Sequence, residues 1–286
     1  MAYRPSRPWA ATRRRTTAAG AAALASALLL AACGSSDGGG GASGPEGVRL
    51  VSQGKLTTCT NVPYEPFQFK QGQKVVGFDV DIVDLAAKRL GVTQEIIDID
   101  FAAIKSGSAL NSNRCDLAAA GMTITPDREK NLTFSAPYFD ATQALMAKKG
   151  SGVTSLADVK TKGLTLGAQA STTGLEYARQ QEFDPIEFAD SPKELLGLQT
   201  GQADVIIQDH AVVATWLKKP EVAAKFELVA NLNTGEQYGI GMKKGNTALK
   251  KVVDEVIQQA RTDGTYDKIY QKWIGTAVPT PSPAGT

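Results

Sequence analysis

Residues 121–139 read GMTITPDREKNLTFSAPYF and contain the local signals from which the fold can be worked out. Thr125 and Pro126 predict the start of a helix, because a threonine oxygen can accept free backbone N–H groups and proline tolerates the first helical position. Arg128 then falls inside the first turn, where the helix dipole disfavours a positive charge. An arginine in this place needs a negative partner, which is either its acidic neighbours in the chain or an anionic ligand.

The same stretch lies in a chain that alternates strand-like and helix-like patterns from Gly54 onward. This alternation of short apolar runs and amphipathic segments predicts parallel α/β layers. A first block has strands expected at 56–60, 94–99 and 117–120 and a helix at 78–90. A second block has strands expected at 164–168, 186–188 and 203–208 and helices at 174–181, 192–200 and 210–218. The two blocks predict two lobes, and we expect them to be connected by paired strands at 144–148 and 237–242.

Residues 1–32 have the composition of a targeting signal. They hold five arginines and no acidic residue, and the cluster Arg13–Arg15 precedes an apolar run that is too short and too alanine-rich for a membrane span. The box Leu30–Cys33 resembles the cleavage site of bacterial lipoproteins, in which Cys33 becomes the lipidated first residue; an ordinary secretory signal is the alternative. The glycine- and serine-rich residues 33–52 predict a flexible linker. We therefore expect an exported protein that is anchored to the outer face of the bacterial cytoplasmic membrane.

Composition argues against two classes of function. The 286 residues carry a formal net charge of +2, and without the five arginines of residues 1–32 the balance is 26 basic against 29 acidic residues, or −3. Neither this balance nor the charge pattern suggests nucleic-acid binding. The single histidine, His210, and the dispersed cysteines cannot form a zinc site, so we expect no metal and no cofactor.

Two cysteines remain besides the lipidation candidate. In an oxidising compartment Cys59 and Cys115 form a candidate disulfide. Against the bond, Cys59 lies near the end of one expected strand and Cys115 just before another, and parallel neighbours in register would hold them too far apart. Both outcomes stay open at this point. Neither cysteine is expected to be catalytic, because His210 is adjacent to neither in sequence.

Several segments, taken together, resemble a known protein family. They are PFQFKQGQKVVGFDVDIVDLAAKRLG (66–91), AAGMTITPDREKNLTFSAPYF (119–139), GLTLGAQASTTGLEYA (163–178), GQADVIIQDH (201–210), QYGIGMKKGN (237–246) and DGTYDKIYQKWIG (263–275). In this order they resemble the extracellular amino-acid-binding proteins of ABC importers, nearest the glutamine-binding branch. The resemblance implies a type II periplasmic-binding-protein fold, in which two α/β lobes joined by two hinge strands close around a ligand.

The resemblance also implies how the chain is divided. Lobe 1 would comprise residues 53–140 plus 238–275, so that both ends of the folded chain build it. Lobe 2 would comprise residues 141–237. The proline-rich residues 276–286 would follow as a disordered tail.

The first group of carried-over residues concerns the carboxylate of an amino-acid ligand. The resemblance implies that Arg128 grips this α-carboxylate, with which a guanidinium makes a bidentate, charge-assisted pair. The free amides of the helix that starts at Thr172 and Thr173 would suit the same group. Thr123 would add a hydroxyl and an amide. Helix capping is the local alternative for Thr172.

The second group concerns the α-ammonium and the ligand's side chain. By resemblance, the Gly121 carbonyl and the Asp209 carboxylate receive the ammonium, and Tyr64 and Phe101 enclose the side chain between two aromatic rings. The local alternatives are a tight turn for Gly121, a helix cap for Asp209, and core positions for the two aromatic residues.

The side-chain end of the expected pocket departs from the glutamine-binding pattern. Asn61, Gln169 and Gln208 stand where that branch has an acidic residue, a lysine and a histidine. Neutral amides can both donate and accept hydrogen bonds. They favour a neutral polar ligand, glutamine or asparagine first, unless Glu65 or Lys70 reaches the pocket.

The function that the resemblance implies is that of a substrate-binding lipoprotein of an ABC transporter. Such a protein would act as a monomer, bind a free L-amino acid and deliver it to the transmembrane subunits of a permease. One alternative is an enzyme similar to cyclohexadienyl dehydratase, which would need a general acid or base poised in the cleft. We expect no catalytic residue, because Asp209 is committed to the ammonium and His210 is expected to face away. The other alternative is a ligand sensor that acts in trans.

Overall fold

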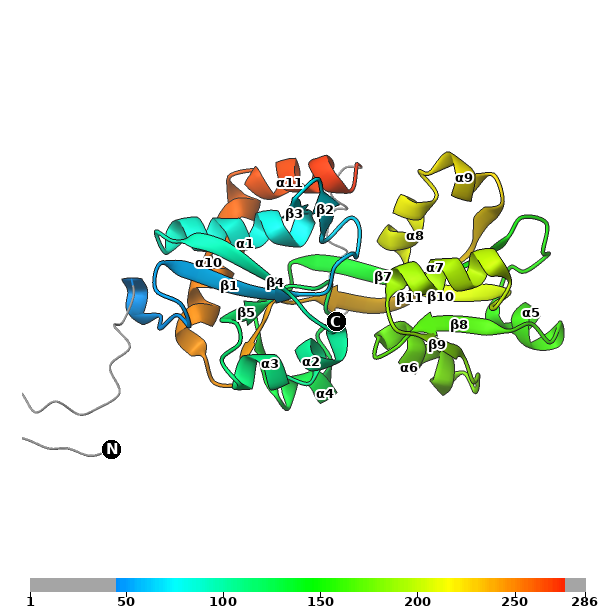
Figure 1. The fold of residues 1–286 in the computed structure, drawn as a ribbon, viewed down its shortest axis with the longest axis horizontal. Helices are drawn as coiled ribbons and strands as arrows, with labels where there is room; N and C mark the ends of the chain where they lie inside the picture. Colours follow the sequence, from blue (N-terminus) through cyan, green and yellow to red (C-terminus); the bar gives the residue numbers. More distant parts are fainter. Residues whose placement is uncertain (1–44, 276–286) are drawn as a thin grey trace, which may run out of the picture. The chain divides into compact units, whose positions relative to one another are not determined.

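The computed structural model describes residues 45–275, which fall within one compact unit. The expected targeting signal, the lipidation candidate Cys33 and the expected tail lie outside the described residues. Two sheets with helices packed on them form two lobes, as the alternating pattern predicted (Figure 1). Among the residues described, no helix combines the length and the apolar character needed to cross a membrane.

The first lobe is built on a five-stranded sheet of order β4-β1-β5-β12-β6. The strands are β1 (Lys55–Thr60), β4 (Thr93–Asp98), β5 (Leu117–Ala118), β6 (Leu132–Phe134) and β12 (Gly241–Lys243). β1 is parallel to β4 and β5, whereas β12 is antiparallel to β5 and β6. A separate hairpin joins β2 (Phe69–Gln71) and β3 (Lys74–Val76).

Helices cover both faces of this sheet. One hydrophobic cluster contains α1 (Phe78–Arg89), α10 (Thr247–Thr262) and α11 (Thr265–Trp273), together with Leu117 of β5. A second cluster contains α2 (Phe101–Lys105) and α3 (Ser108–Asn111), together with the next strand residue, Ala118. Successive strand residues point to opposite faces, so the short apolar run of β5 serves both clusters.

The second lobe is built on a sheet of order β11-β7-β10-β8-β9. The strands are β7 (Phe139–Lys148), β8 (Leu166–Gln169), β9 (Ile186–Phe188), β10 (Val205–Asp209) and β11 (Phe226–Tyr238). The helices are α5 (Leu156–Thr161), α6 (Thr173–Gln180), α7 (Ser191–Thr200), α8 (His210–Trp216) and α9 (Pro220–Ala223). β8 and β10 are buried along their whole length. This burial accounts for the apolar runs Leu166–Ala168 and Val205–Ile207 within them.

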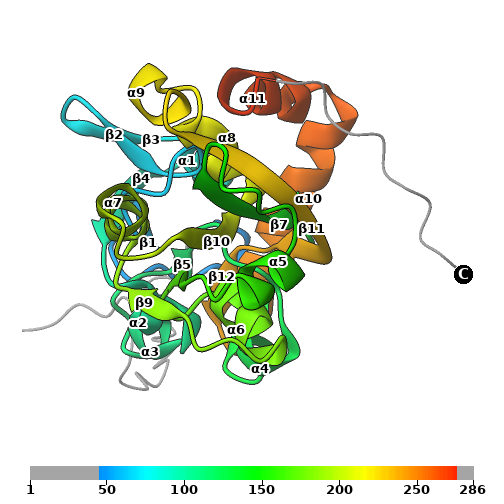
Figure 2. The same ribbon diagram turned by 90° about the vertical axis from the view of Figure 1, so that its right-hand side faces the viewer.

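β7 and β11, which belong to the second sheet, run side by side from the first lobe into the second (Figures 1 and 2). The two predicted connecting strands do pair with each other, but the ranges 144–148 and 237–242 are wrong, because β11 ends at Tyr238 and Gly241–Lys243 form β12 of the first sheet. Tyr238 lies opposite Phe139, whereas Ala144 lies opposite Asn231. Residues 231–237 read NLNTGEQ, a polar sequence that lacks the usual strand signals, but residues 231, 232, 236 and 237 pair with the neighbouring β7.

Residues 45–52, the end of the predicted flexible linker, are packed on the first lobe. A short 3₁₀ helix, Pro45–Gly47, is followed by Val48, whose side chain is 1% exposed in the core. The backbone N–H of Val51 donates to the buried Asp116 carboxylate, 2.6 Å away. The linker prediction is therefore wrong for these eight residues, because Val48 and, in part, Leu50 bury apolar surface that glycine and serine cannot.

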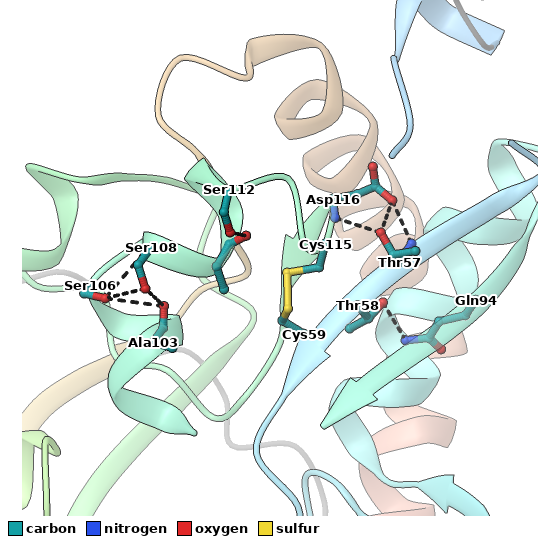
Figure 3. Close-up of a disulfide and its surroundings, with 11 residues drawn as sticks. Thr57, Thr58, Cys59, Gln94, Ala103, Ser106, Ser108, Ser112, Cys115 and Asp116 are labelled. Atoms are coloured by element: carbon teal, nitrogen blue, oxygen red, sulfur yellow. Dashed lines mark hydrogen bonds between the residues drawn. A yellow bond between two sulfur atoms is a disulfide. The ribbon is translucent and has the colours of Figure 1, made fainter. Parts of the chain in front are cut away.

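Cys59 and Cys115 are joined by a disulfide in the first lobe (Figure 3). β1 and β5 are parallel neighbours, as expected, and Cys59 lies opposite Ala118. Cys115 precedes the paired stretch, at a point where the chain arrives from α3, and its Cα lies 5.7 Å from that of Cys59. The objection from strand spacing does not apply there, because Cys115 is outside the ladder.

Removing this disulfide is expected to lower the free energy of unfolding by about 4 kcal/mol, the chain-entropy value for a loop of this length. The bond joins residues that lie 56 positions apart in sequence. Chemical denaturation of a Cys59→Ala/Cys115→Ala variant would measure the loss. Reductant should destabilise the wild type and leave the double variant unchanged. Equal midpoints for wild type and variant without reductant would contradict the expectation.

Candidate functional site

The ten residues proposed from the sequence to bind a ligand line one enclosed cavity between the two lobes. They are Asn61, Tyr64, Phe101, Gly121, Thr123, Arg128, Gln169, Thr172, Thr173 and Asp209. Most lie just after the carboxyl ends of β1, β5, β8 and β10, where open α/β sheets bind ligands. Two further residues, Gln68 and Ala120, complete the lining. The cavity has a volume of about 20 Å³, room for about one water molecule, so a larger ligand can enter only when the lobes move apart.

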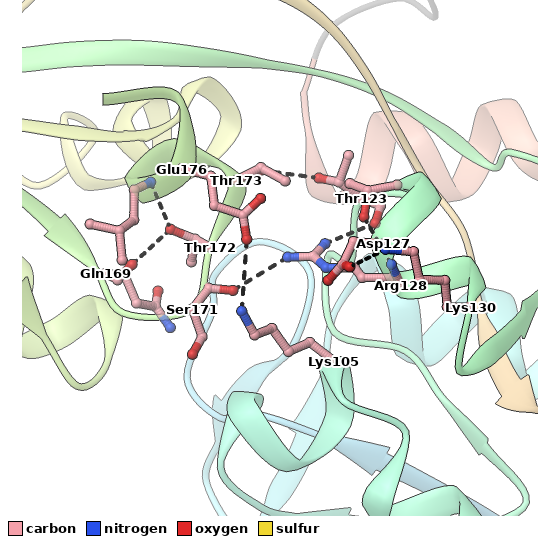
Figure 4. Close-up of polar contacts among 12 residues, drawn as sticks. Lys105, Thr123, Asp127, Arg128, Lys130, Gln169, Ser171, Thr172, Thr173 and Glu176 are labelled. Carbon is pink, nitrogen blue, oxygen red and sulfur yellow. Dashed lines mark hydrogen bonds and ion pairs between the residues drawn. The ribbon is translucent and has the colours of Figure 1, made fainter. Parts of the chain in front are cut away.

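Arg128 is a buried cation at the boundary of the two lobes (Figure 4). Its guanidinium donates to the carbonyl oxygens of Thr123, at 2.8 Å, and Ser171, at 3.4 Å. It also lies over the ring of Phe101, 5.4 Å from the centroid. Burial lowers the pKa of Arg128, and nearby acidic groups, Glu176 first, oppose this effect.

No carboxylate among residues 45–275 forms an ion pair with the Arg128 guanidinium. The sequence neighbour Asp127 is exposed and pairs with Lys130 instead, at 3.0 Å. Thr125 caps α4 (Pro126–Glu129) by accepting from the Arg128 N–H, which confirms the predicted helix start. The acidic neighbours of Arg128 in the sequence therefore do not pair with its charge. Two parallel N–H donors in a buried place can bind an anionic ligand.

The start of α6 lies on the other side of the cavity from Arg128's own helix. Thr172 caps this helix, since its hydroxyl accepts from the Leu175 N–H and donates to the Gln169 carbonyl. This hydroxyl is thus fully engaged, as the capping alternative supposed. The Thr173 hydroxyl lies 3.4 Å from that of Thr123 in the first lobe.

Asp209 is buried and surrounded by donors. Its carboxylate accepts from the hydroxyls of Tyr64 and Tyr238 and from the side-chain amide of Gln143. Although Asp209 immediately precedes α8, its side chain makes no capping hydrogen bond, so the helix-cap alternative is wrong. Burial, followed by the charge of Glu236, raises the pKa of Asp209 to about 6. A ligand ammonium near this carboxylate would favour its charged form.

Gly121 has a conformation and a contact that explain the glycine. Its φ is +55°, and a Cβ built there would lie 2.9 Å from Cε1 of Tyr64. Its N–H donates to the buried carboxylate of Asp79, at 2.8 Å, and the Tyr138 hydroxyl donates to the same carboxylate. The backbone at Gly121 is thus fixed between an aromatic ring and a buried acid.

The cavity wall near Asn61 carries amide groups. The Asn61 amide donates to the Ile99 carbonyl, and Gln68 donates to the Asn61 carbonyl. The Oε1 atoms of Gln68 and Gln169 are buried and have no hydrogen-bond partner among the described residues. These two oxygens are acceptors to which a ligand with N–H groups could donate.

Three residues weighed for this end do not line the cavity. The Gln208 side chain accepts from the Tyr64 hydroxyl at 2.7 Å and donates to the buried Glu194 of the second lobe at 2.6 Å. Glu65 pairs with Lys219, and Lys70 is likewise absent from the cavity lining. His210 lies half-buried beside a separate cavity behind the hinge strands, to which Asp209 also contributes.

Sequence reasoning missed several polar residues around this cavity. Gln68 lies on its wall, and Asp79, Gln143 and Glu236 hold the side chains or backbone of its lining, whereas Glu194 accepts from Gln208, which does not line it. Each contacts a partner more than ten residues away in sequence, except that Gln68 contacts Asn61 seven residues before it. No local pattern marks such residues; the one available signal was the polar Gln68 in the aromatic run PFQF.

Comparison with known proteins gives a consistent result. Residues 56–276 match the family model described as bacterial extracellular solute-binding proteins, family 3. The chain is 30% identical over 225 residues to the arginine-binding extracellular protein ArtP of Bacillus subtilis. The matched region covers 77% of this chain and 86% of that protein.

Two solved structures are similar in both sequence and fold. An ancestral arginine-binding protein bound to glutamine is 36% identical, with a TM-score of 0.72 over 79% of this chain and 100% of that chain. The ancestral amino-acid-binding protein AncCDT-1, a precursor of cyclohexadienyl dehydratase, is 31% identical, with a TM-score of 0.71 over 78% of this chain and 96% of that chain.

Proposed function

Because the chain belongs to the bacterial extracellular solute-binding proteins of family 3, we propose that it captures a polar amino acid in this cavity and delivers it to the permease of an ABC importer. The observation that carries the proposal is the buried Arg128, whose guanidinium contacts carbonyls of both lobes and no carboxylate of the described chain. Asp209, also on the cavity wall, supplies the opposite charge. A buried cation and a buried anion on one small cavity are complementary to the zwitterion of an α-amino acid.

The screen that tests this proposal is a thermal-shift measurement of the purified protein against the twenty amino acids and a set of cyclic and keto acids. A ligand that binds the folded state alone raises the melting temperature. We expect a shift with one or a few amino acids. A shift with a cyclic acid alone, accompanied by its turnover, would instead favour the enzyme similar to cyclohexadienyl dehydratase.

Within the amino acids, we propose glutamine, with asparagine second. The free acceptors on Gln68 and Gln169 favour a side chain that donates hydrogen bonds. An arginine ligand also donates. Among the described residues that line the cavity, however, Asp209 is the one carboxylate, and its position suits the ligand's α-ammonium. A guanidinium at the side-chain end would then be buried without a charge partner on the wall. Glutamate would place a carboxylate against two acceptors, so glutamine should bind at least tenfold more tightly than glutamate.

We also propose that Cys33 carries a lipid, which would hold a monomeric binding protein beside the permease subunits that receive its ligand. The support is the box Leu30–Cys33 at the end of an apolar run. Cell fractionation of a Cys33→Ala variant would test the anchor, because loss of the lipid should release the protein from the membrane fraction.

A Gly121→Ala variant is expected to lose at least tenfold in amino-acid affinity. The new Cβ would lie 2.9 Å from the Tyr64 ring, so the ring and its hydroxyl contact with Asp209 must shift. The matched control is Gly91→Ala: Gly91 has a similar φ of +66°, and no atom lies within 4 Å of the added Cβ. Both variants should lose about 1 kcal/mol of stability from the backbone conformation. Titration calorimetry should find near-normal affinity for the control, and equal losses in both variants would contradict a local effect at Tyr64.

A further inference from the structure

Glu236 lies on the hinge strand β11, at a break in its pairing with β7. The register shifts between Leu232 and Glu236, and Gly235 within this break has a φ of +64°. Such irregularities redirect a side chain that a regular strand would point elsewhere. No role for Glu236 follows from the sequence pattern around it.

A single oxygen of Glu236 connects three parts of the molecule. Oε2 accepts from the Thr123 hydroxyl of the first lobe, at 3.1 Å, and from the Thr173 hydroxyl at the start of α6 in the second lobe, at 3.0 Å. It also accepts from the Gln143 amide of the other hinge strand, at 3.1 Å. When the lobes separate at the two threonines, at least one of these charge-assisted bonds must break.

The three partners of Glu236 belong to the candidate site, whereas Glu236 itself does not line the cavity. Thr123 and Thr173 are lining residues, and Gln143 also donates to Asp209. Glu236 lies instead in the open groove next to the cavity, which shares the two threonines with it. Glu236 thus contacts the two threonines from outside the cavity, so it need not contact the ligand itself.

Other contacts between the lobes lie inside the cavity, involve partly exposed charged side chains such as Lys219 with Glu65, or join neutral groups, as when the Ser191 hydroxyl donates to the Pro63 carbonyl. Those of Arg128 with Ser171 and of Tyr64 with Asp209 lie inside the cavity, where a ligand would compete for the same groups. The pair Lys105–Glu176 is partly exposed, at 3.7 Å. Exposed pairs of this kind contribute little to stability. The contacts of Glu236 are charge-assisted, combine both lobes and both hinge strands, and come from a carboxylate that lies outside the cavity.

We propose that Glu236 is a positioning residue for ligand capture: its carboxylate holds Thr123 and Thr173 together across the lobes and so stabilises the closed arrangement. The proposal rests on the function proposed above. Because the closed arrangement binds the ligand, its population in the free protein scales the apparent affinity. Glu236 should therefore change the affinity for all ligands by the same factor, since it does not contact the ligand's side chain.

The test compares Glu236→Ala, Glu236→Gln and a matched control, Glu227→Ala. Glu227 lies on the same strand, and its side chain accepts from Gly150 within the second lobe. Titration calorimetry with the best amino acid of the screen and with a weaker one should show about tenfold weaker binding of both by Glu236→Ala, by the same factor. Glu236→Gln, whose amide oxygen can still accept from the hydroxyls, should be intermediate, and Glu227→Ala should match the wild type.

Small-angle scattering of the ligand-free proteins gives a second readout that needs no ligand. The radius of gyration of Glu236→Ala should exceed that of the wild type, and Glu227→Ala should not. Unchanged affinity and radius would overturn the proposal, and so would tighter binding, which would mean that Glu236 competes with the ligand. If the wild type bound no amino acid, the proposed function would fail, while the radii would still decide whether Glu236 closes the lobes.

Discussion

Arg128→Ala is expected to lose binding of every α-amino acid, by more than a hundredfold. In the proposed complex the ligand's carboxylate pairs with the buried Arg128 guanidinium. Removing one partner of a buried pair leaves the other charge unpaired, at a cost of about 3–5 kcal/mol. Titration calorimetry with the amino acid found by the thermal-shift screen measures this loss. Wild-type affinity would refute the assignment of Arg128 to the carboxylate.

Two further variants separate the loss of this contact from a loss of folding. Arg128→Lys keeps the charge but not the planar pair of donors, so its affinity should fall between those of wild type and Arg128→Ala. Arg179→Ala removes an exposed arginine that pairs with Glu187, and it should bind normally. An amine analogue of the ligand that lacks the carboxylate should bind wild type and Arg128→Ala with similar, weak affinity.

The fold could be predicted where local patterns and tertiary packing agree. Thr125 and Pro126 mark the start of α4 because capping is a local interaction, and β8 and β10 are apolar because both faces of their sheet are covered. β11 could not be predicted, since its polar residues 231–237 gain strand structure from pairing with β7. Val48 was missed for a related reason: its burial depends on a surface supplied by the first lobe.

The candidate site divides in the same way. Its lining residues could be proposed because the segments that carry them resemble the amino-acid-binding family, and the structure brings all ten to one cavity; their roles toward a ligand remain predictions. The residues that hold this lining were missed. Asp79 contacts Gly121 across 42 positions, and Glu236 contacts Thr123 across 113, so neither contact leaves a trace in the nearby sequence.

Asp209→Asn is expected to weaken amino-acid binding by ten- to a hundredfold, because a hydrogen bond to a charged group contributes about 1.5–3 kcal/mol. Asparagine retains an oxygen for Tyr64 and Tyr238 but has no charge for the ligand's ammonium. The discriminating ligand is an analogue without the α-amino group, such as glutaramate if the ligand is glutamine. Calorimetry should find similar affinities of wild type and variant for this analogue. Equal losses for both ligands would mean that Asp209 acts through its contacts with Tyr64, Gln143 and Tyr238 instead.

The dependence of binding on pH gives an independent check on Asp209. Its pKa is raised to about 6 in the ligand-free protein, mainly by burial. A proton therefore competes with the ligand's ammonium, and wild-type affinity should fall as the pH drops through about 6, whereas that of Asp209→Asn should change less. The effect on unfolding has the opposite sign: a raised carboxyl pKa means that the folded state binds the proton more tightly than the unfolded chain. The contribution of Asp209 to stability is thus greatest below about pH 4 and is lost as the pH rises through 6. As the pH rises through this interval, the wild type should bind the ligand more tightly and, without ligand, become less stable, each relative to Asp209→Asn. Both changes together would locate the two effects at this one carboxylate.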